Sequence, residues 1–206
     1  MPRGKVFVVS GPSGAGKDTL VRELVKKYPR AVTAVTATTR PLRRGEVEGR
    51  EYLFLSEEEF QRRVERGEFL EWAWVHGNRY GTPRRQIEDA LAQGKDVFLR
   101  IDVQGASAAK RQIPEALLIF IFPPNLAELE QRLRDRATEE EEDLERRLGV
   151  ATQEMEEGKR LFDYSIVNDE LDKALRELFE FYEKETRGED ITDVDEAEDR
   201  RSSKDE

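Results

Sequence analysis

Residues 11–17 read Gly11-Pro12-Ser13-Gly14-Ala15-Gly16-Lys17, a glycine-rich loop that ends in a lysine. A short run rich in β-branched residues at 5–10 precedes the loop, and a helical pattern over 17–28 follows it. Between a strand and a helix, glycines let backbone N–H groups surround phosphate oxygens, and the helix N-terminus adds positive potential. The lysine then reaches the β- and γ-phosphates, so the stretch predicts a binding site for a nucleoside triphosphate.

Strands and helices alternate along the rest of the chain. Besides the first strand, we expect strands at 31–35, 51–55, 68–75, 95–102, 117–122 and 164–167. After the first helix, we expect helices from the cap Ser56 and at 84–92, 106–111, 126–136, 139–159 and 171–184, with a turn-like segment at 78–83. Alternation of this kind is typical of an α/β fold in which helices flank a parallel sheet.

The length of 206 residues suggests one domain, followed by an acidic end. The segment 187–206 carries nine acidic and four basic residues, so its net charge of −5 is half of the −10 of the whole chain. It has no aromatic residue and no apolar periodicity, so it cannot bury enough surface to offset the entropy lost on ordering. We expect this tail to be disordered, with an acidic interaction segment as the alternative.

The composition excludes several classes of function. The sequence has no cysteine, which rules out disulfides and thiolate chemistry and fits a reducing cytoplasm. The apolar run at 6–9 is too short for a signal peptide or a membrane span. The net charge of −10 disfavours general nucleic-acid binding, because a phosphate backbone requires a basic face. We therefore expect neither a membrane nor a nucleic-acid partner.

The residue after Lys17 is Asp18, where this kind of loop normally carries a serine or threonine whose hydroxyl binds Mg²⁺. A carboxylate is a hard oxygen ligand, so Asp18 is a candidate magnesium ligand. Alternatively, Asp18 simply suits the first turn of a helix, where negative charge is favourable. The sequence leaves both interpretations open.

A second concentration of polar side chains follows the second expected strand. Arg40 and Arg43 stand three residues apart in an irregular segment, and arginine forks bind phosphate oxygens in a bidentate manner. Further polar side chains of the same region are Tyr52, Glu71, Tyr80 and Thr82. Tyrosine hydroxyls can complete a phosphate site, and a buried glutamate can accept two N–H groups from a guanine edge. The region therefore predicts a site for a phosphorylated acceptor.

Six motifs together resemble those of guanylate kinases. They are the loop at 11–17, Thr38-Thr39-Arg40-Pro41-Leu42-Arg43-Arg44-Gly45-Glu46, Phe69-Leu70-Glu71-Trp72-Ala73, Gly77-Asn78-Arg79-Tyr80-Gly81-Thr82, Ile101-Asp102-Val103-Gln104-Gly105 and Ile166-Val167-Asn168-Asp169. The resemblance covers nearly all of residues 5–185. It implies a P-loop NTPase fold and, with Mg²⁺ as cofactor, transfer of a phosphoryl group from ATP to GMP. The implied domain at 1–186 has a core (1–35, 93–131 and 160–186), a GMP-binding lobe (36–92) and a lid (132–159).

The resemblance also implies roles for individual residues. ATP would be bound by Gly11, Pro12, Ser13, Gly14, Ala15, Gly16, Lys17, Asp18, Thr19, Arg132, Arg136 and Asn168, the last approaching the adenine. GMP would be bound by Thr36, Arg40, Arg43, Tyr52, Glu71, Tyr80 and Thr82, of which Thr36, Glu71 and Thr82 read the guanine. Lys17, Arg43, Arg136 and Arg147 would be catalytic, and Asp18 and Asp102 are the candidate magnesium ligands. The lid arginines have an ordinary alternative, which is a charged helix face.

Three positions depart from the family pattern. Thr36 replaces a serine but keeps the hydroxyl, and Ala137 replaces a glycine of the lid. Arg100 replaces an acidic residue that usually helps to bind the base, which reverses the local charge. We expect either that Arg100 pairs with Glu71 or Glu46, or that the acceptor is not GMP.

Two other functions stand as alternatives. A P-loop kinase of another acceptor, such as a ribose 1,5-bisphosphate phosphokinase, shares the Gly-Lys-Asp end of the loop, although the segments around Glu71 and Tyr80 argue against it. A guanylate-kinase-like module that only binds a protein partner would normally lack Lys17. Direct phosphoryl transfer needs no protein nucleophile, so the single histidine, His76, is expected at the surface. The sequence leaves the oligomeric state open.

Overall fold

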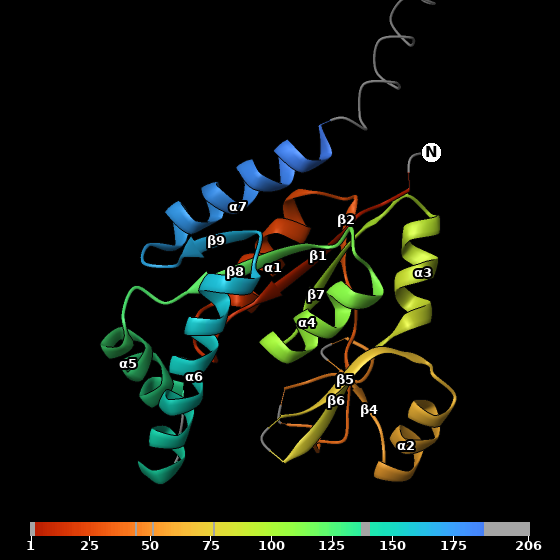
Figure 1. The fold of residues 1–206 in the computed structure, drawn as a ribbon, viewed down its shortest axis with the longest axis horizontal. Helices are drawn as coiled ribbons and strands as arrows, with labels where there is room; N and C mark the ends of the chain where they lie inside the picture. Colours follow the sequence, from red (N-terminus) through yellow and green to blue (C-terminus); the bar gives the residue numbers. More distant parts are fainter. Residues whose placement is uncertain (1–2, 44, 51, 76, 137–140, 188–206) are drawn as a thin grey trace, which may run out of the picture.

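The computed structural model describes residues 3–43, 45–50, 52–75, 77–136 and 141–187, with the backbone alone at 136 and 141–143. The expectations for His76, for Ala137 and for the tail after residue 187 therefore lie outside the described residues. In the described part, strands and helices alternate along the chain and form two sheets (Figure 1). Among these residues, no helix has the length and apolar character that a membrane crossing requires.

The larger sheet has five strands in the described residues, in the order β2-β7-β1-β8-β9, and all neighbouring pairs are parallel. These strands are β1 (Val6–Ser10), β2 (Ala31–Thr33), β7 (Asp96–Arg100), β8 (Leu117–Phe122) and β9 (Tyr164–Val167). Their β-branched and aromatic side chains suit a sheet that is covered on both faces. The parallel arrangement places the carboxyl ends of the strands at one edge, where ligands bind in open α/β sheets.

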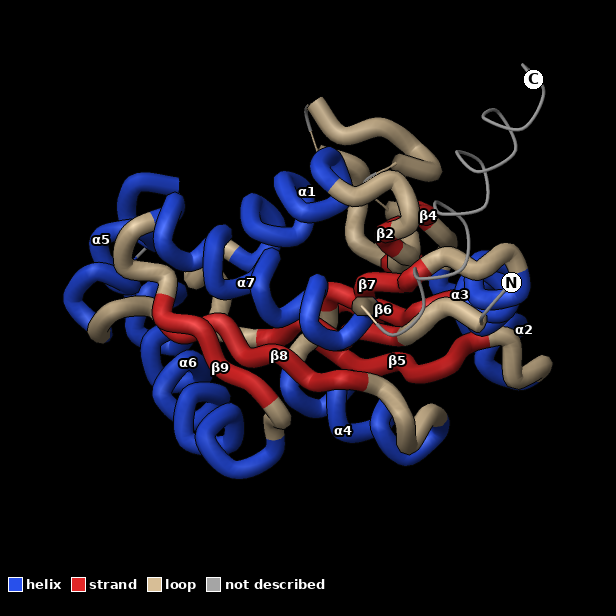
Figure 2. The backbone as a smooth tube through the Cα atoms, turned by 90° about the horizontal axis from the view of Figure 1, so that it is seen from above, coloured by secondary structure: helices blue, strands red, loops and turns tan. Residues whose placement is uncertain are grey.

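Alternating side chains along β1 build a hydrophobic core on each face of this sheet. The helices that cover it are α1 (Lys17–Lys27), α3 (Arg84–Ala92), α4 (Val103–Gln112) and α7 (Leu171–Thr186). Phe7 and Val9 pack on the face of α1 and α7, and Val6 and Val8 on the face of α3 and α4. Figure 2 shows α1 and α7 on one side of the sheet and α4 on the other. This burial fixes β1, and with it the position of the loop at its carboxyl end.

A smaller sheet and one helix form a lobe next to the carboxyl edge of the larger sheet (Figure 1). Its elements are β3 (Ala37–Thr38), β4 (Leu53–Phe54), α2 (Glu57–Glu65), β5 (Phe69–Val75) and β6 (Asn78–Pro83). The expectation of a turn at 78–83 is wrong, because these residues pair with β5 as an antiparallel strand. The chain reverses at Gly77 instead, whose φ of 75° is readily adopted only by glycine.

Side-chain hydrogen bonds to the backbone explain where several elements begin and end. The hydroxyl of Ser56 accepts a hydrogen bond from the backbone of Glu59 at 3.2 Å, so the predicted cap of α2 is confirmed. α4 begins at Val103 rather than at 106, because the carboxylate of Asp102 caps it by accepting from the backbone of Gly105 at 2.7 Å. β2 ends earlier than expected, since the backbone N–H of Val35 donates to the side chain of Gln86.

Two helices, α5 (Leu126–Arg136) and α6 (Glu141–Leu161), stand opposite the lobe in Figure 1. They pack on each other through a small apolar cluster of Leu129, Leu133, Leu144 and Ala151. This cluster is separate from the two cores of the larger sheet. The helix pair therefore has an apolar cluster of its own, while Gly158 of α6 also lies against Phe120 of β8.

Candidate active site

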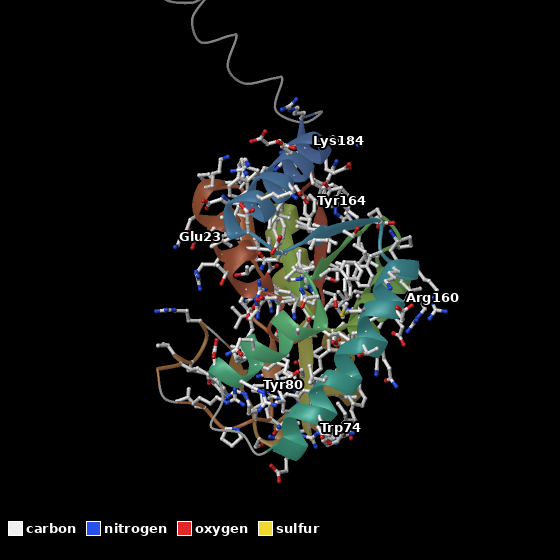
Figure 3. The ribbon with its side chains drawn as sticks, turned by 90° about the vertical axis from the view of Figure 1, so that its left-hand side faces the viewer. Glu23, Trp74, Tyr80, Arg160, Tyr164 and Lys184 are labelled. Carbon is white, nitrogen blue, oxygen red and sulfur yellow. The ribbon has the colours of Figure 1, made fainter. Side chains whose placement is uncertain are left out.

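A cleft of about 480 Å³ lies at the carboxyl edge of the larger sheet, between the lobe and α6. The core lines it with Gly11, Ser13, Gly14, Gly16, Lys17, Asp18, Thr19, Arg100 and Asp102. The lobe contributes Thr36, Tyr52, Glu71, Trp74 and Tyr80, and α6 contributes Arg147, Val150, Gln153, Glu154 and Glu157. Figure 3 shows Trp74 and Tyr80 at the lobe end of the molecule, far from Lys184 at the other end. Most of the predicted site residues thus meet in one cleft.

The phosphate loop joins β1 to α1 at the bottom of this cleft. Gly11, Gly14 and Gly16 have φ values of 142°, 88° and 94°, which let the backbone curl into a loop. The ammonium group of Lys17 folds over the loop and donates hydrogen bonds to the carbonyls of Gly11 at 2.6 Å and Pro12 at 3.0 Å. Lys17 is therefore held at the loop, within reach of phosphate oxygens bound there.

Asn168 supports the phosphate loop from behind. Its side-chain amide donates a hydrogen bond of 2.8 Å to the carbonyl of Ala15, and a Cβ at Gly16 would lie only 2.2 Å from that amide nitrogen. Arg132 of α5 donates to the backbone carbonyl of Asn168 at 3.1 Å. Asn168 is buried, so its side chain is engaged with the loop rather than extended into the cleft toward an adenine. Pro12 and Ala15 likewise shape the loop without lining the cleft.

Asp18, which departs from the usual phosphate loop, contacts Arg100, which departs from the family pattern. A guanidinium nitrogen of Arg100 (Nη1) donates to Oδ1 of Asp18 at 3.0 Å. The expectation that Arg100 pairs with Glu71 or Glu46 is therefore wrong. Arg100 ends β7 and is in register with Val9 of β1, so its side chain reaches the first turn of α1 more readily than the lobe.

Arg40 is buried and held by a bidentate ion pair with Glu46. Its two terminal nitrogens donate to the Glu46 carboxylate at 2.7 and 3.0 Å, and one of them also donates to the carbonyl of Pro41. Glu46 raises the pKa of the Arg40 guanidinium, and Tyr80 acts in the same direction. The guanidinium also lies 5.2 Å from the centre of the Tyr52 ring. Arg40 is thus fixed beside the two tyrosines of the predicted phosphate site.

The other members of the predicted acceptor-phosphate group differ in exposure. Tyr52 and Tyr80 pack edge to face with ring centres 5.9 Å apart, and both line the cleft. Burial raises the pKa of the Tyr52 phenol, and the nearby charge of Asp18 raises it further. Arg43 is exposed, and its backbone N–H donates to Glu46 at 2.8 Å. The structure therefore brings Arg40 and the tyrosines together, whereas the Arg43 side chain lies at the surface.

Glu71 is the most deeply buried carboxylate that lines the cleft, with 7% of its surface exposed. It accepts a hydrogen bond from the hydroxyl of Thr82, and Thr36 is buried in the same wall of the lobe. Burial raises the pKa of Glu71 to about 7, against the lowering effect of the Thr82 hydrogen bond. A buried carboxylate in a wall with two buried threonines is suited to receive N–H donors of a ligand.

Asp102 faces the end of the cleft where Glu71 lies, as well as capping α4. Its nearby charge contributes to the raised pKa of Glu71, and a Cβ at Gly105 would lie 2.9 Å from Glu71 Oε2 and 3.2 Å from Asp102 Oδ1. Within the described ranges, no three His, Cys, Asp or Glu side chains form a group that could hold a metal ion. Mg²⁺ commonly binds through one or two carboxylates and the nucleotide's own phosphates, which Asp18 beside Lys17 fits better than Asp102 does.

On the α6 side of the cleft, Arg147 was predicted from the sequence, whereas Val150, Gln153, Glu154 and Glu157 were not. Arg147 lines the cleft, whereas the side chain of Arg136 lies outside the described part of the structure. Glu154 also lines the cleft, and burial raises its pKa to about 7, with Lys17 lowering and Asp102 raising it. Glu154 follows Arg147 by seven residues, or two helical turns, so helical spacing from Arg147 could have indicated it.

The family model of guanylate kinases matches residues 3–185 of the sequence. The chain belongs to the guanylate kinase family. This membership confirms the resemblance read from the six motifs, and the α/β fold with its parallel five-stranded sheet agrees with it.

Relatives and a solved structure of the family extend the match over most of the chain. A guanylate kinase of Symbiobacterium thermophilum is 50% identical over 177 residues, which cover 86% of this chain and 83% of that protein. One of Rubrobacter xylanophilus is 46% identical over 190 residues, or 92% of this chain and 99% of that protein. The crystal structure of guanylate kinase from Anaplasma phagocytophilum superposes with a TM-score of 0.74 at 32% identity, covering 89% and 87% of the two chains.

Proposed function

We propose that this chain phosphorylates GMP, transferring the γ-phosphoryl group of ATP to the GMP phosphate to give ADP and GDP. Membership of the guanylate kinase family supports this reaction. The structural observation that supports it best is that the two ends of one cleft have different chemistry. Lys17 and the phosphate loop lie at one end, and the buried carboxylate of Glu71 lies in the lobe at the other.

The transfer is a direct displacement. An oxygen of the GMP phosphate attacks the γ-phosphorus, the bond from that phosphorus to the β–γ bridging oxygen breaks, and ADP leaves with that oxygen. The acceptor phosphate is already an anion at neutral pH, so no side chain has to act as a nucleophile. The protein's task is to align the two phosphates and to neutralise their charge. Lys17 supplies positive charge on the donor side, and Arg147 faces the same cleft from α6.

The acceptor would lie against the lobe. Arg40, Arg43, Tyr52 and Tyr80 bind its phosphate, and Arg40 is already oriented by Glu46. Glu71 accepts hydrogen bonds from the guanine edge, with the hydroxyls of Thr36 and Thr82 beside it. A carboxylate at this place favours a base that presents N–H donors and disfavours a second phosphate, as on ribose 1,5-bisphosphate.

The proposal includes a magnesium ion and a moving lid. Asp18 fits as the magnesium ligand because its carboxylate adjoins Lys17 and is 71% exposed. When bound with ATP, Mg²⁺ neutralises charge on the β- and γ-phosphates. Residues 132–159 form the lid, 36–92 the GMP-binding lobe, and 1–35, 93–131 and 160–186 the core. Lid closure over both substrates would exclude water and so prevent ATP hydrolysis. Arg132, Arg136 and Arg147 move with the lid. We also propose that the protein is located in the cytoplasm.

An acceptor panel tests the proposal. Release of ADP from ATP and Mg²⁺ is followed by a coupled assay with GMP, AMP, UMP, CMP and ribose 1,5-bisphosphate. We expect turnover with GMP to exceed turnover with each other acceptor by at least a hundredfold. Activity with ribose 1,5-bisphosphate but not with GMP would establish the first alternative. No turnover with any acceptor would favour a module that only binds.

Substitution of the loop lysine separates catalysis from folding. Lys17→Ala removes the charge beside the β- and γ-phosphates, so we expect kcat to fall by about 10²–10³-fold with the circular dichroism spectrum unchanged. Lys26→Ala is the matched control, because Lys26 belongs to the same helix but is exposed and pairs only with Glu23 in the described structure. Near-normal turnover of Lys17→Ala would contradict the site.

A further inference from the structure

Arg100 lies where the donor and acceptor halves of the cleft meet. It is the last residue of β7, next to the end of β1 from which the phosphate loop starts. Its side chain is 26% exposed and lines the cleft, and Nη1 donates to Asp18 Oδ1 at 3.0 Å. Asp18 adjoins Lys17 of the loop, so the pair places one end of the Arg100 guanidinium on the donor side.

The same guanidinium also lies close to the acceptor side. The charges of Asp18 and Arg100 both act on the pKa of the Tyr52 phenol, which burial raises. The ring of Tyr52 packs against Tyr80 at 5.9 Å and lies 5.2 Å from the Arg40 guanidinium, so it belongs to the group that would bind the acceptor phosphate. Arg100 therefore lies between the loop that binds one phosphate chain and the side chains that bind the other.

The ion pair leaves most of the Arg100 donors available. A guanidinium has five N–H donors in a rigid fork, and the hydrogen bond to Asp18 uses one of them. Its Nε is buried and has no hydrogen-bond partner among the described residues. An arginine held by one carboxylate, with further donors in a phosphate cleft, is suited to bind phosphoryl oxygens.

The ion pair itself contributes little to folding. Asp18 is 71% exposed, and ion pairs open to solvent are screened and weakly stabilising. A pair of this kind in a cleft for phosphates has more effect on where the arginine points than on the stability of the fold. Asp18 holds the Arg100 side chain at the junction, in the way that Glu46 holds Arg40 in the lobe.

We propose that Arg100 is a catalytic residue of this chain: its guanidinium contacts the phosphoryl group in flight, and Asp18 positions it. During transfer the γ-phosphorus exchanges its bond to the β–γ bridging oxygen for a bond to the acceptor oxygen, and no proton or electron leaves the pair of nucleotides. Charge on the oxygens of the moving group is neutralised by the Arg100 donors, which act together with Lys17. This role rests on the proposed function, since it requires a phosphorylated acceptor beside Tyr52.

Steady-state kinetics of Arg100→Gln test this role. Loss of a contact made in the transition state lowers kcat and leaves substrate binding nearly unchanged. We expect kcat with GMP to fall by about 10²–10³-fold. The KM for GMP and the dissociation constants of ATP and GMP, measured by calorimetry, should change less than threefold. Arg85→Gln is the control, because Arg85 is exposed outside the cleft and pairs with Asp89. A wild-type kcat, or a change in KM alone, would overturn the proposal.

The melting temperature distinguishes catalysis from a structural contact. Because an ion pair open to solvent stabilises the fold only weakly, we expect Arg100→Gln to lower kcat while its melting temperature stays close to that of the wild-type protein. A fall in the melting temperature that accounts for the lost activity of Arg100→Gln would show that Arg100 only maintains the fold. If wild-type protein does not phosphorylate GMP at all, the proposed function fails instead, which the acceptor panel detects separately.

Discussion

The side-chain amide of Asn168 donates a hydrogen bond of 2.8 Å to the carbonyl oxygen of Ala15, across 153 positions of the sequence. Asn168 directly follows β9, and Ala15 lies in the phosphate loop. The hydrogen bond therefore ties the loop to the carboxyl end of an edge strand of the sheet. Because Arg132 donates to the backbone carbonyl of Asn168, the same residue also connects the loop to α5. The conformation of the phosphate loop thus depends on elements far from it in sequence.

Asn168→Ala should weaken both the fold and the donor site. The variant leaves the buried carbonyl of Ala15 without its partner, which costs about 1–3 kcal/mol. We expect the free energy of unfolding to fall by this amount and the KM for ATP to rise several-fold, with the KM for GMP unchanged. Denaturant unfolding and steady-state kinetics measure these effects. Asp169→Ala, at the exposed neighbouring position, is the control, and equal behaviour of the two variants would refute the supporting role of Asn168.

The phosphate loop could be predicted from sequence because its determinants are local. A strand, the glycines, the lysine and a helix follow one another within about twenty residues, and each acts on its neighbours in the chain. The motifs of the lobe were also sufficient to place Glu71, Tyr52 and Tyr80 in the same cleft as the loop. The family membership then confirmed the combination.

Contacts between distant segments could not be predicted in the same way. Arg100 was expected to pair with a lobe carboxylate, but its partner is decided by the β1–β7 register, which places it beside α1. The Gly and Asn residues of β6 are typical of turns and predict one at 78–83, whereas pairing with β5 makes this segment a strand. Glu154 is one of many glutamates in α6, and its burial near Lys17 depends on the packing of the folded chain rather than on its sequence neighbours.

Binding of GMP should depend on pH through Glu71. Its pKa is raised to about 7, so the carboxyl group loses its charge as the pH falls below 7 and can then no longer accept two N–H groups. We expect the KM for GMP of wild-type protein to rise by up to tenfold per unit of pH below 7. Glu71→Gln should have a high KM for GMP at every pH, with no dependence of this kind. Glu68→Gln, an exposed neighbour, should retain the wild-type profile.

Stability provides a second measurement on Glu71. Since the folded-state pKa of this acid is raised above the unfolded value, Glu71 costs no stability below about pH 4.5 and lowers the free energy of unfolding increasingly as the pH rises to about 7. Removing the charge with Glu71→Gln should therefore stabilise the protein at pH 8, by up to about 3 kcal/mol, and have little effect near pH 4. Denaturant titrations at the two pH values measure the difference. Equal effects at both pH values would show that Glu71 is not held with a raised pKa.

Glu46→Gln should raise the KM for GMP without changing kcat much. The bidentate pair at 2.7 and 3.0 Å fixes the Arg40 fork, and a neutral side chain leaves this buried cation less well oriented. We expect a several-fold rise in the KM for GMP and no change in the KM for ATP, measured by steady-state kinetics. Glu65→Gln on the exposed face of α2 is the control. An unchanged KM for GMP would mean that the ion pair does not prepare Arg40 for the acceptor phosphate.

Glu154 should make ATP binding weaker as the pH rises. Burial raises its pKa to about 7, and the ionised carboxylate interacts with Lys17, which the donor phosphates also need. Above pH 7 the carboxylate competes for Lys17 and repels the phosphates, whereas below pH 7 it is neutral. We expect the KM for ATP of wild-type protein to rise between pH 6 and pH 8. Glu154→Gln should remove this rise and have the lower KM at pH 8.

The control for this last variant is Glu156→Gln, because Glu156 belongs to the same helix but is exposed and pairs with Lys159 at 2.7 Å. It should keep the wild-type pH profile. If Glu154→Gln instead raises the KM for ATP at pH 8, the carboxylate assists donor binding, as it would by orienting Lys17. A pH profile unaltered by Glu154→Gln would place the titration on another group. The direction of the change in the KM for ATP thus decides whether Glu154 of α6 opposes or assists the binding of ATP at the phosphate loop.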